Sequence, residues 1–235
     1  MADLWIFGDS YSESNEMLYG KKTKQAKYVQ QFYRTKGLYP IHFTDILNRK
    51  FKFNSIHNYA IGGISNYTIL EIIGIHIDKI KPNDYVCIGW SYTLRDRIVI
   101  NNRWVDRLPS VDLEEHIKYR ANIPSPSKFF DIETFYKVIA ERDSILPINE
   151  VIHWQNILKK SLPENTLFWS PFGKDMYNNF DIDIPFYFLP KVPNLIREEC
   201  NIEDKHYSSS GHEYVGECLY NAFLKLNKEK KSKLL

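Results

Sequence analysis

The sequence predicts an α/β fold, a three-layer α/β/α sandwich with a mainly parallel sheet flanked by helices. Short apolar runs alternate along the chain with amphipathic helical segments, which is the pattern of such sheets. Hydrophobic residues make up 43% of the 235 residues and charged residues 26%, enough to bury the core of one domain. Distinctive polar residues follow the apolar runs directly. Ligands bind at the carboxyl ends of parallel strands, so we expect the functional site there.

Four buried strands and one hairpin are expected. The strands are short runs of apolar and aromatic residues at Leu4 to Phe7, Ser55 to Ala60, Tyr85 to Ile88 and Thr166 to Ser170. Residues 97–107 alternate apolar and polar side chains around two central asparagines, which predicts a hairpin.

Five segments have a helical pattern. They are Pro40 to Asn48, Asn66 to Ile80, Ile132 to Arg142, Ile148 to Lys160 and Gly211 to Leu226. Residues 171–193 hold four prolines among many aromatic residues, so we expect them to be irregular but ordered. We expect a single domain over residues 1–227, with a hairpin and loop insertion around 92–130, and a basic tail over 228–235.

Charge and hydropathy exclude several functions. Lys plus Arg minus Asp plus Glu is 31 − 29 = +2, too little for a general nucleic-acid-binding surface. The most apolar long stretch, residues 67–80, contains Glu71, His76 and Asp78 and is too interrupted to span a membrane. No basic region precedes the apolar run at residues 4–7, so we expect no signal peptide and a protein kept in the cytoplasm or built into a virion.

No metal or cofactor site is expected. Cys87, Cys200 and Cys218 lack ligand spacing and are expected to be reduced thiols. Five histidines are scattered without ligand spacing, which favours surface positions or satisfied core positions: His42, His57, His76, His116 and His153.

Two motifs follow the first two predicted strands. Ser10 stands in a glycine-containing turn, where a serine can present both its hydroxyl and its N–H. Gly62 and Gly63 follow the second strand and let the backbone approach a ligand closely. The helix that comes next is expected to be capped by Ser65 or Asn66.

Two further motifs lie later in the chain. Residues 89–91, Gly-Trp-Ser, follow the third strand. Near the last helix, Glu203 and Asp204 precede His206, and His212 follows it. A carboxylate two or three residues before a histidine can orient the imidazole through its second nitrogen. Each motif alone is a weak signal, but four in this order indicate a catalytic site.

This order of motifs resembles the SGNH, or GDSL-type, hydrolase superfamily, from residue 8 to about residue 222. The resemblance implies Ser10 as the nucleophile and His206, five residues before a glycine, as the general base. It also implies an oxyanion hole made by the N–H of Ser10 and the N–H of Gly63, five residues after Asn58. The resemblance further implies a flavodoxin-like sheet and a reaction that needs no cofactor.

The sequence departs from the family pattern in two places. The triad acid usually stands three residues before the histidine, where this chain has Glu203, but Asp204 is the preferred candidate because Asp is the commoner triad acid. The third block usually supplies an Asn as oxyanion donor, and here Ser91 stands in its place, so we expect its hydroxyl to donate. His212 is the less favoured base.

Residues beside the motifs are candidates for a substrate rim, although ordinary packing also explains most aromatic side chains. The rim candidates are Tyr11, Asn66, Trp90 and Arg95. The resemblance implies a serine esterase for small acyl esters, with O-acetyl groups on carbohydrate ahead of lipid, through a Ser-His-Asp triad and an acyl-enzyme. The alternative is a non-catalytic SGNH-fold module, either glycan-binding or a structural part of a virion. The composition and the residues after Gly89 resemble phage-encoded members.

Overall fold

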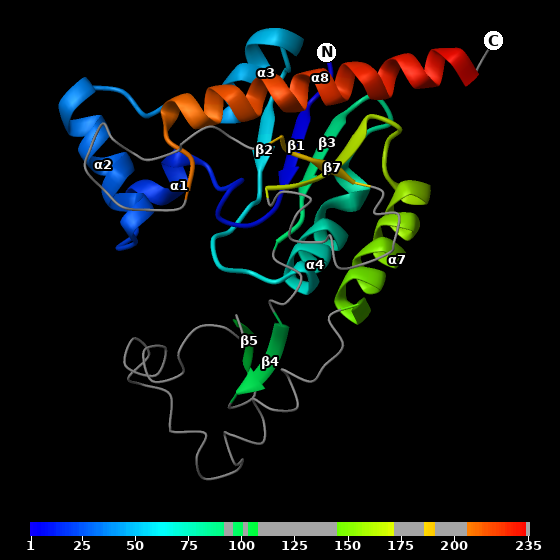
Figure 1. Cartoon of the computed structure of the whole chain (residues 1–235), viewed down its shortest axis with the longest axis horizontal. Coiled ribbons are helices and arrows are strands. Elements are labelled where there is room, and N and C mark those ends of the chain that lie inside the picture. The colour runs from blue at the N-terminus through cyan, green and yellow to red at the C-terminus, as the bar shows by residue number, and fades with distance from the viewer. Residues whose placement is uncertain (92–95, 101–102, 108–144, 172–185, 191–205, 234–235) are drawn as a thin grey trace.

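The protein contains a five-stranded parallel sheet in a computed structural model. The structure describes residues 1–91, 96–100, 103–107, 145–171, 186–190 and 206–233. The strands are β1 (Leu4–Phe7), β2 (Ile56–Asn58), β3 (Tyr85–Gly89), β6 (Thr166–Ser170) and β7 (Tyr187–Phe188). Their order in the sheet is β2-β1-β3-β6-β7 (Figure 1).

The register of the sheet places the carboxyl ends of neighbouring strands together. Leu4 of β1 pairs with Ile56 of β2 on one side and with Tyr85 of β3 on the other. The four neighbouring strand pairs of this sheet are all parallel, so the segments that follow β1, β2 and β3 leave from one edge. Three of the four sequence motifs come directly after these strands.

Helices cover both faces of the sheet (Figure 1). α3 (Phe43–Phe51) and α8 (Ser209–Lys233) pack on the face that includes Leu4 and Ile6. α4 (Asn66–His76) and α7 (Ile145–Ser161) pack on the opposite face, against Trp5 and Phe7. Successive residues of β1 thus serve the two cores alternately, as expected for a strand buried on both sides. The predicted three-layer sandwich is confirmed.

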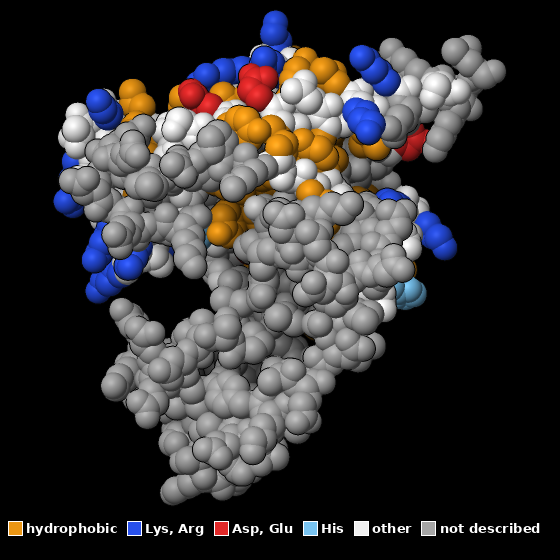
Figure 2. All heavy atoms as spheres, viewed as in Figure 1, with side chains coloured by type: hydrophobic (Ala, Val, Ile, Leu, Met, Phe, Trp, Pro, Cys, Tyr) orange, Lys and Arg blue, Asp and Glu red, His pale blue; other side chains and the backbone are white. Residues whose placement is uncertain are grey.

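α1 (Asn15–Tyr19) and α2 (Lys24–Lys36) were not predicted from the sequence. They pack on each other through a small cluster of Leu18, Tyr28 and Val29. Figure 2 shows Lys and Arg side chains gathered over these two helices, at the left of the view. The two helices therefore expose a basic surface and bury only a narrow apolar stripe.

The remaining elements agree with the expected pattern in part. β4 (Asp96–Ile100) and β5 (Arg103–Arg107) form the predicted antiparallel hairpin. α4 continues into a short 3₁₀ helix, η1 (Ile77–Lys79), and α8 extends beyond the expected Leu226 to Lys233. The helix expected at residues 132–142 lies outside the described residues.

Within the described ranges, no helix is long and apolar enough to cross a membrane. Cys87 is a buried free thiol and Cys218 a half-buried one, while Cys200 lies outside the described residues. His57 pairs with Asp3 over 3.1 Å, and His76 stacks on Tyr59 with ring centroids 3.8 Å apart.

Candidate active site

Ser10 lies half-buried in a tight turn that follows β1. Asp9 builds this turn, because its Oδ1 accepts from the N–H of Tyr11 over 3.1 Å and its carbonyl accepts from the N–H of Ser12 over 3.0 Å. Gln25 of α2 donates to the carbonyl of Ser10 over 2.9 Å. These hydrogen bonds fix the backbone on both sides of the Ser10 hydroxyl.

His206 is the partner of Ser10. Its Nε2 lies 2.8 Å from Ser10 Oγ, although the two residues are 196 positions apart in the sequence. In the tautomer that carries its proton on Nδ1, the imidazole accepts a hydrogen bond from the hydroxyl. The ring of Tyr11 packs beside it, with centroids 4.9 Å apart. The structure therefore brings the expected nucleophile and base together, while Asp204 and Glu203 lie outside the described residues.

The segment after His206 is held firmly at the start of α8. Tyr207 is 3% exposed and packs in the core on the α3 and α8 side of the sheet. Ser208 accepts a hydrogen bond from a backbone N–H of the first turn, and the N–H of Ser209 donates to the hydroxyl of Tyr28 over 3.0 Å. The position of the imidazole thus follows from the packing of α8.

His212, the alternative base, lies in the first turn of α8 and is 5% exposed. Its ring packs 4.6 Å from the ring of His42 and 5.4 Å from that of Tyr207, measured between centroids. Burial lowers the pKa of His42 to about 3, so this histidine is neutral in the core. The contact with Ser10 belongs to His206, as expected, and His212 is a core residue.

Gly63, the expected oxyanion donor, lies in the exposed turn after β2 with φ +86°, a conformation that favours glycine. Gly62 brings this turn against the nucleophile, because a Cβ on Gly62 would lie 3.3 Å from the Cβ of Ser10. Asn58, at the end of β2, connects the two turns, since its side-chain amide donates to the carbonyl of Ser12 over 2.8 Å and its Oδ1 accepts from the N–H of Ala60 over 3.0 Å. Gly63 therefore lies one residue from a direct contact with Ser10.

Ser91 is fully buried and has a different set of contacts from those expected. Its hydroxyl donates to Oδ2 of Asp9 over 3.0 Å. Its N–H donates to Oδ1 of Asn66 over 2.7 Å, and its carbonyl accepts from Nδ2 of the same side chain over 3.1 Å. Because Asp9 already uses the single hydroxyl proton, this geometry does not support the expected role of Ser91 as a third oxyanion donor.

Two of the four residues expected at a substrate rim are buried, which corrects that prediction. Trp90 is fully buried, and its indole N–H donates to Oε1 of Gln155 over 3.3 Å. Asn66 is 4% exposed, and both ends of its amide bind the backbone at the end of β3. Tyr11 is half-buried beside the imidazole, and Arg95 lies outside the described residues.

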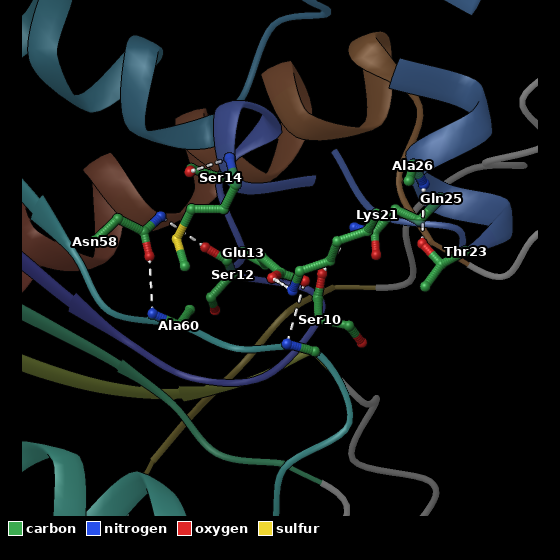
Figure 3. Close-up of polar contacts among 12 residues, drawn as sticks. Ser10, Ser12, Glu13, Ser14, Lys21, Thr23, Gln25, Ala26, Asn58 and Ala60 are labelled. Atoms are coloured by element: carbon green, nitrogen blue, oxygen red, sulfur yellow. Dashed lines mark hydrogen bonds and ion pairs between the residues drawn. The ribbon is translucent and has the colours of Figure 1, made fainter. Parts of the chain in front are cut away.

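The sequence did not indicate an ion pair beside the nucleophile that joins a buried carboxylate to a partly exposed lysine. Glu13, three residues after Ser10, accepts a hydrogen bond from the N–H of Gly62 over 3.1 Å and forms an ion pair with Lys21 (Figure 3). The side chain of Glu13 is only 1% exposed. Lys21 lies between α1 and α2, so the pair depends on two helices that the sequence pattern did not reveal. Within the described part of the chain, no group of three or more His, Cys, Asp or Glu side chains could hold a metal ion.

Two solved structures resemble this one over nearly the whole chain. One is the psychrotrophic esterase EstA from Pseudoalteromonas sp., inhibited by monoethylphosphonate, with 9% sequence identity, a TM-score of 0.45 and coverage of 97% of this chain and 100% of that one. The other is TesA, with 8% identity, a TM-score of 0.41 and coverage of 95% and 99%. No protein-family model matches the chain, and no curated protein matches it in sequence.

Proposed function

We propose that this protein is a serine ester hydrolase of the SGNH type that forms an acyl-enzyme on Ser10. The observation that carries the proposal is the 2.8 Å contact between His206 Nε2 and Ser10 Oγ at the carboxyl end of β1. A serine hydroxyl is a weak nucleophile, and a neutral imidazole within hydrogen-bonding distance activates it. Ser10 is only half-buried, as a residue that must meet a substrate has to be.

The reaction we propose has two halves. First, Ser10 Oγ bonds to the carbonyl carbon while its proton passes to His206, and the N–H groups of Ser10 and Gly63 donate to the new oxyanion. The C–O bond to the alcohol then breaks, and His206 gives the proton to the departing oxygen. In the second half, water attacks the acyl carbonyl carbon while His206 takes its proton. The bond between Ser10 Oγ and this carbon then breaks, His206 returns the proton to Oγ, and the carboxylic acid leaves. Asp204, or Glu203 in its place, would orient the imidazole through Nδ1.

We assign small acyl esters as the substrate class, with O-acetyl groups on carbohydrate ahead of lipid esters. The half-buried ring of Tyr11 beside the imidazole supports this assignment, since an aromatic face suits the apolar side of a sugar ring. The sequence also lacks a long apolar segment that would serve as a lipid-binding lid.

Hydrolysis of p-nitrophenyl acetate and labelling by a fluorophosphonate probe test the proposal together. The wild type should hydrolyse the ester, and peptide mapping should locate the probe on Ser10. Ser10→Ala should do neither, whereas Ser210→Ala, on an exposed serine of α8, should keep both. A screen of acetylated sugars with acetate release as the readout then identifies the natural ester.

Folded wild-type protein that neither hydrolyses the ester nor takes the label would overturn the proposal. That outcome would favour the alternative, a non-catalytic module of the same fold that binds glycans or belongs to a virion. One observation favours the non-catalytic alternative. The hydroxyl of Ser91 donates to Asp9, whereas the family usually has a third oxyanion donor at this position.

A further inference from the structure

Glu13 connects the turn of the nucleophile with the turn that carries Gly63. One carboxylate oxygen, Oε2, accepts from the N–H of Gly62 over 3.1 Å, and the other pairs with Nζ of Lys21. The Glu13 side chain is 1% exposed, whereas that of Lys21 is 38% exposed. Figure 3 shows the two side chains meeting beside Ser10.

We infer that Glu13 is a positioning residue that, with Lys21, holds the turn of Gly62 and Gly63 in the orientation that presents the Gly63 N–H to the oxyanion. The catalytic consequence of this inference rests on the proposed function. The structural consequence, a turn held by a buried carboxylate, can be measured without any reaction.

The contacts of Gly62 carry the first step of this inference. A Cβ on Gly62 would lie 2.8 Å from Oε2 of Glu13 and 3.3 Å from Cβ of Ser10, so the backbone of the turn lies close to both residues and leaves no room for a side chain. The carboxylate fixes the peptide group that precedes Gly62, and Gly63 follows with φ +86°. Rotation of this turn therefore requires the hydrogen bond to Glu13 to break.

The charges of Glu13 and Lys21 give the second step of this inference. A buried carboxylate without a counter-ion is unfavourable, and a negative charge near a developing oxyanion opposes the reaction. Lys21 neutralises Glu13 while part of its side chain stays in contact with water. Gln30 of α2 holds the lysine backbone, because its amide donates to the Lys21 carbonyl over 3.2 Å. The segment between α1 and α2 thus supplies the cation that offsets the cost of burying a carboxylate at this site.

Four variants separate the effect of the Glu13 oxygen, which accepts from the N–H of Gly62, from the effect of the Glu13 and Lys21 charges. Glu13→Ala removes the acceptor, so kcat should fall about tenfold or more while KM changes little. Glu13→Gln keeps an oxygen for the N–H of Gly62 and should lower kcat only a few-fold, because a neutral acceptor binds less strongly than a charged one. Lys21→Met leaves the carboxylate without its cation and should lower kcat about tenfold or more. The double variant Glu13→Gln/Lys21→Met should return to the kcat of Glu13→Gln.

A matched control comes from the surface. Lys50 and Glu217 form an ion pair over 3.0 Å with side chains 40% and 49% exposed, so Glu217→Gln removes a comparable charge from α8. This variant should keep the wild-type kcat. Equal kcat values for the wild type and for folded Glu13→Ala, Glu13→Gln and Lys21→Met would overturn the inference.

Amide hydrogen exchange gives the readout that does not depend on activity. Exchange in a peptide that covers residues 61–63 should be faster in Glu13→Ala than in the wild type, and unchanged in Glu217→Gln. If the wild type has no esterase activity, the proposed function fails, and this exchange result alone decides whether Glu13 holds the turn. If the wild type is active and exchange in Glu13→Ala is unchanged, the positioning inference fails while the proposed function stands.

Discussion

Ser91 donates its hydroxyl hydrogen bond to the carboxylate of Asp9 over 3.0 Å, and both residues are almost fully buried. Asp9 directly precedes Ser10, and Ser91 follows β3, so this hydrogen bond connects the nucleophile turn with the neighbouring strand. Asn66, at the start of α4, adds two hydrogen bonds to the backbone of Ser91. The third motif therefore supports the turn that carries Ser10.

Ser91→Ala should affect stability more than catalysis. It removes a donor from the buried carboxylate of Asp9, which typically costs about 1–3 kcal/mol. The melting temperature should then fall by roughly 2–4 °C for each kcal/mol lost. At a temperature where the variant is folded, kcat should fall less than about tenfold, below the 10²–10³ typical of a lost oxyanion donor. An unchanged melting temperature with a hundredfold lower kcat would mean that the Ser91 hydroxyl is an oxyanion donor after all.

His206→Ala should remove nearly all activity, with a loss in kcat on the order of 10⁴ or more. The side chain is half-buried at the site, so the melting temperature should change little. His212→Phe keeps a ring against His42 and Phe43, and its kcat should stay near that of the wild type. Ester hydrolysis by both purified variants, with exposed His153→Ala as the control, checks this. A folded but inactive His212→Phe would reverse the assignment of the base.

Four of the five strands were predictable because a parallel sheet buried on both faces needs short, continuous apolar runs. The fifth, β7, was missed, because it has only two residues and lies in the proline-containing segment that was expected to be irregular. β1 and β6 begin and end where the sequence indicated, and β2 and β3 differ by only one or two residues. α8 extends to Lys233 although its last residues are mostly charged. Lysine and glutamate are good helix formers, so the helix does not need an apolar face to continue there.

The burial of Trp90 could have been predicted from the sequence. Side chains alternate between the two faces of a strand, and Val86, Ile88 and Trp90 all lie in the core beneath α4 and α7. Continuing this alternation one residue past β3 would have predicted a buried Trp90. Proximity to a motif in the sequence does not say which face of the sheet a side chain takes.

α2 was missed because few of its residues are strongly apolar, although both of its ends carry signals. Thr23 accepts from the N–H of Ala26 at the first turn, and Gly37 ends the helix with φ +72°. Between them the buried stripe is short and partly polar. Without α1 and α2, nothing in the sequence places Lys21 beside Glu13. This partly buried ion pair depends on how the segment between the two helices packs beside Glu13, which no local sequence pattern shows.

His42 should make the stability of the protein fall in acid. Burial holds its folded-state pKa at about 3, below the ordinary value of 6.5, so between these pH values only the unfolded chain is protonated there. The stabilising effect of the neutral ring is fully present above about pH 6.5 and is lost as the pH falls toward 3. From pH 7 to pH 5 this residue should cost about 2 kcal/mol of unfolding free energy.

Urea unfolding of the wild type and of His42→Asn at both pH values checks this. Asn keeps the N-terminal cap that His42 provides for α3 by accepting from the N–H of Thr44. The variant should therefore lack this part of the pH dependence, and the wild type should lose about 2 kcal/mol more than the variant. Equal losses in the two proteins would mean that His42 is not held neutral in the fold.

Gly62→Ala should lower kcat without greatly lowering stability. Gly62 is not among the residues with positive φ, so an alanine backbone fits, but its Cβ would lie 2.8 Å from Oε2 of Glu13 and 3.3 Å from Cβ of Ser10. One of these two neighbours must move, and either movement misplaces the nucleophile or the turn that carries Gly63. A displacement of a few tenths of an ångström at these positions should lower kcat about tenfold, with KM nearly unchanged. Gly20→Ala is the control, because no described atom lies within 4 Å of its Cβ position, and it should keep full activity. Wild-type kcat in Gly62→Ala would show that this contact does not position the reacting groups.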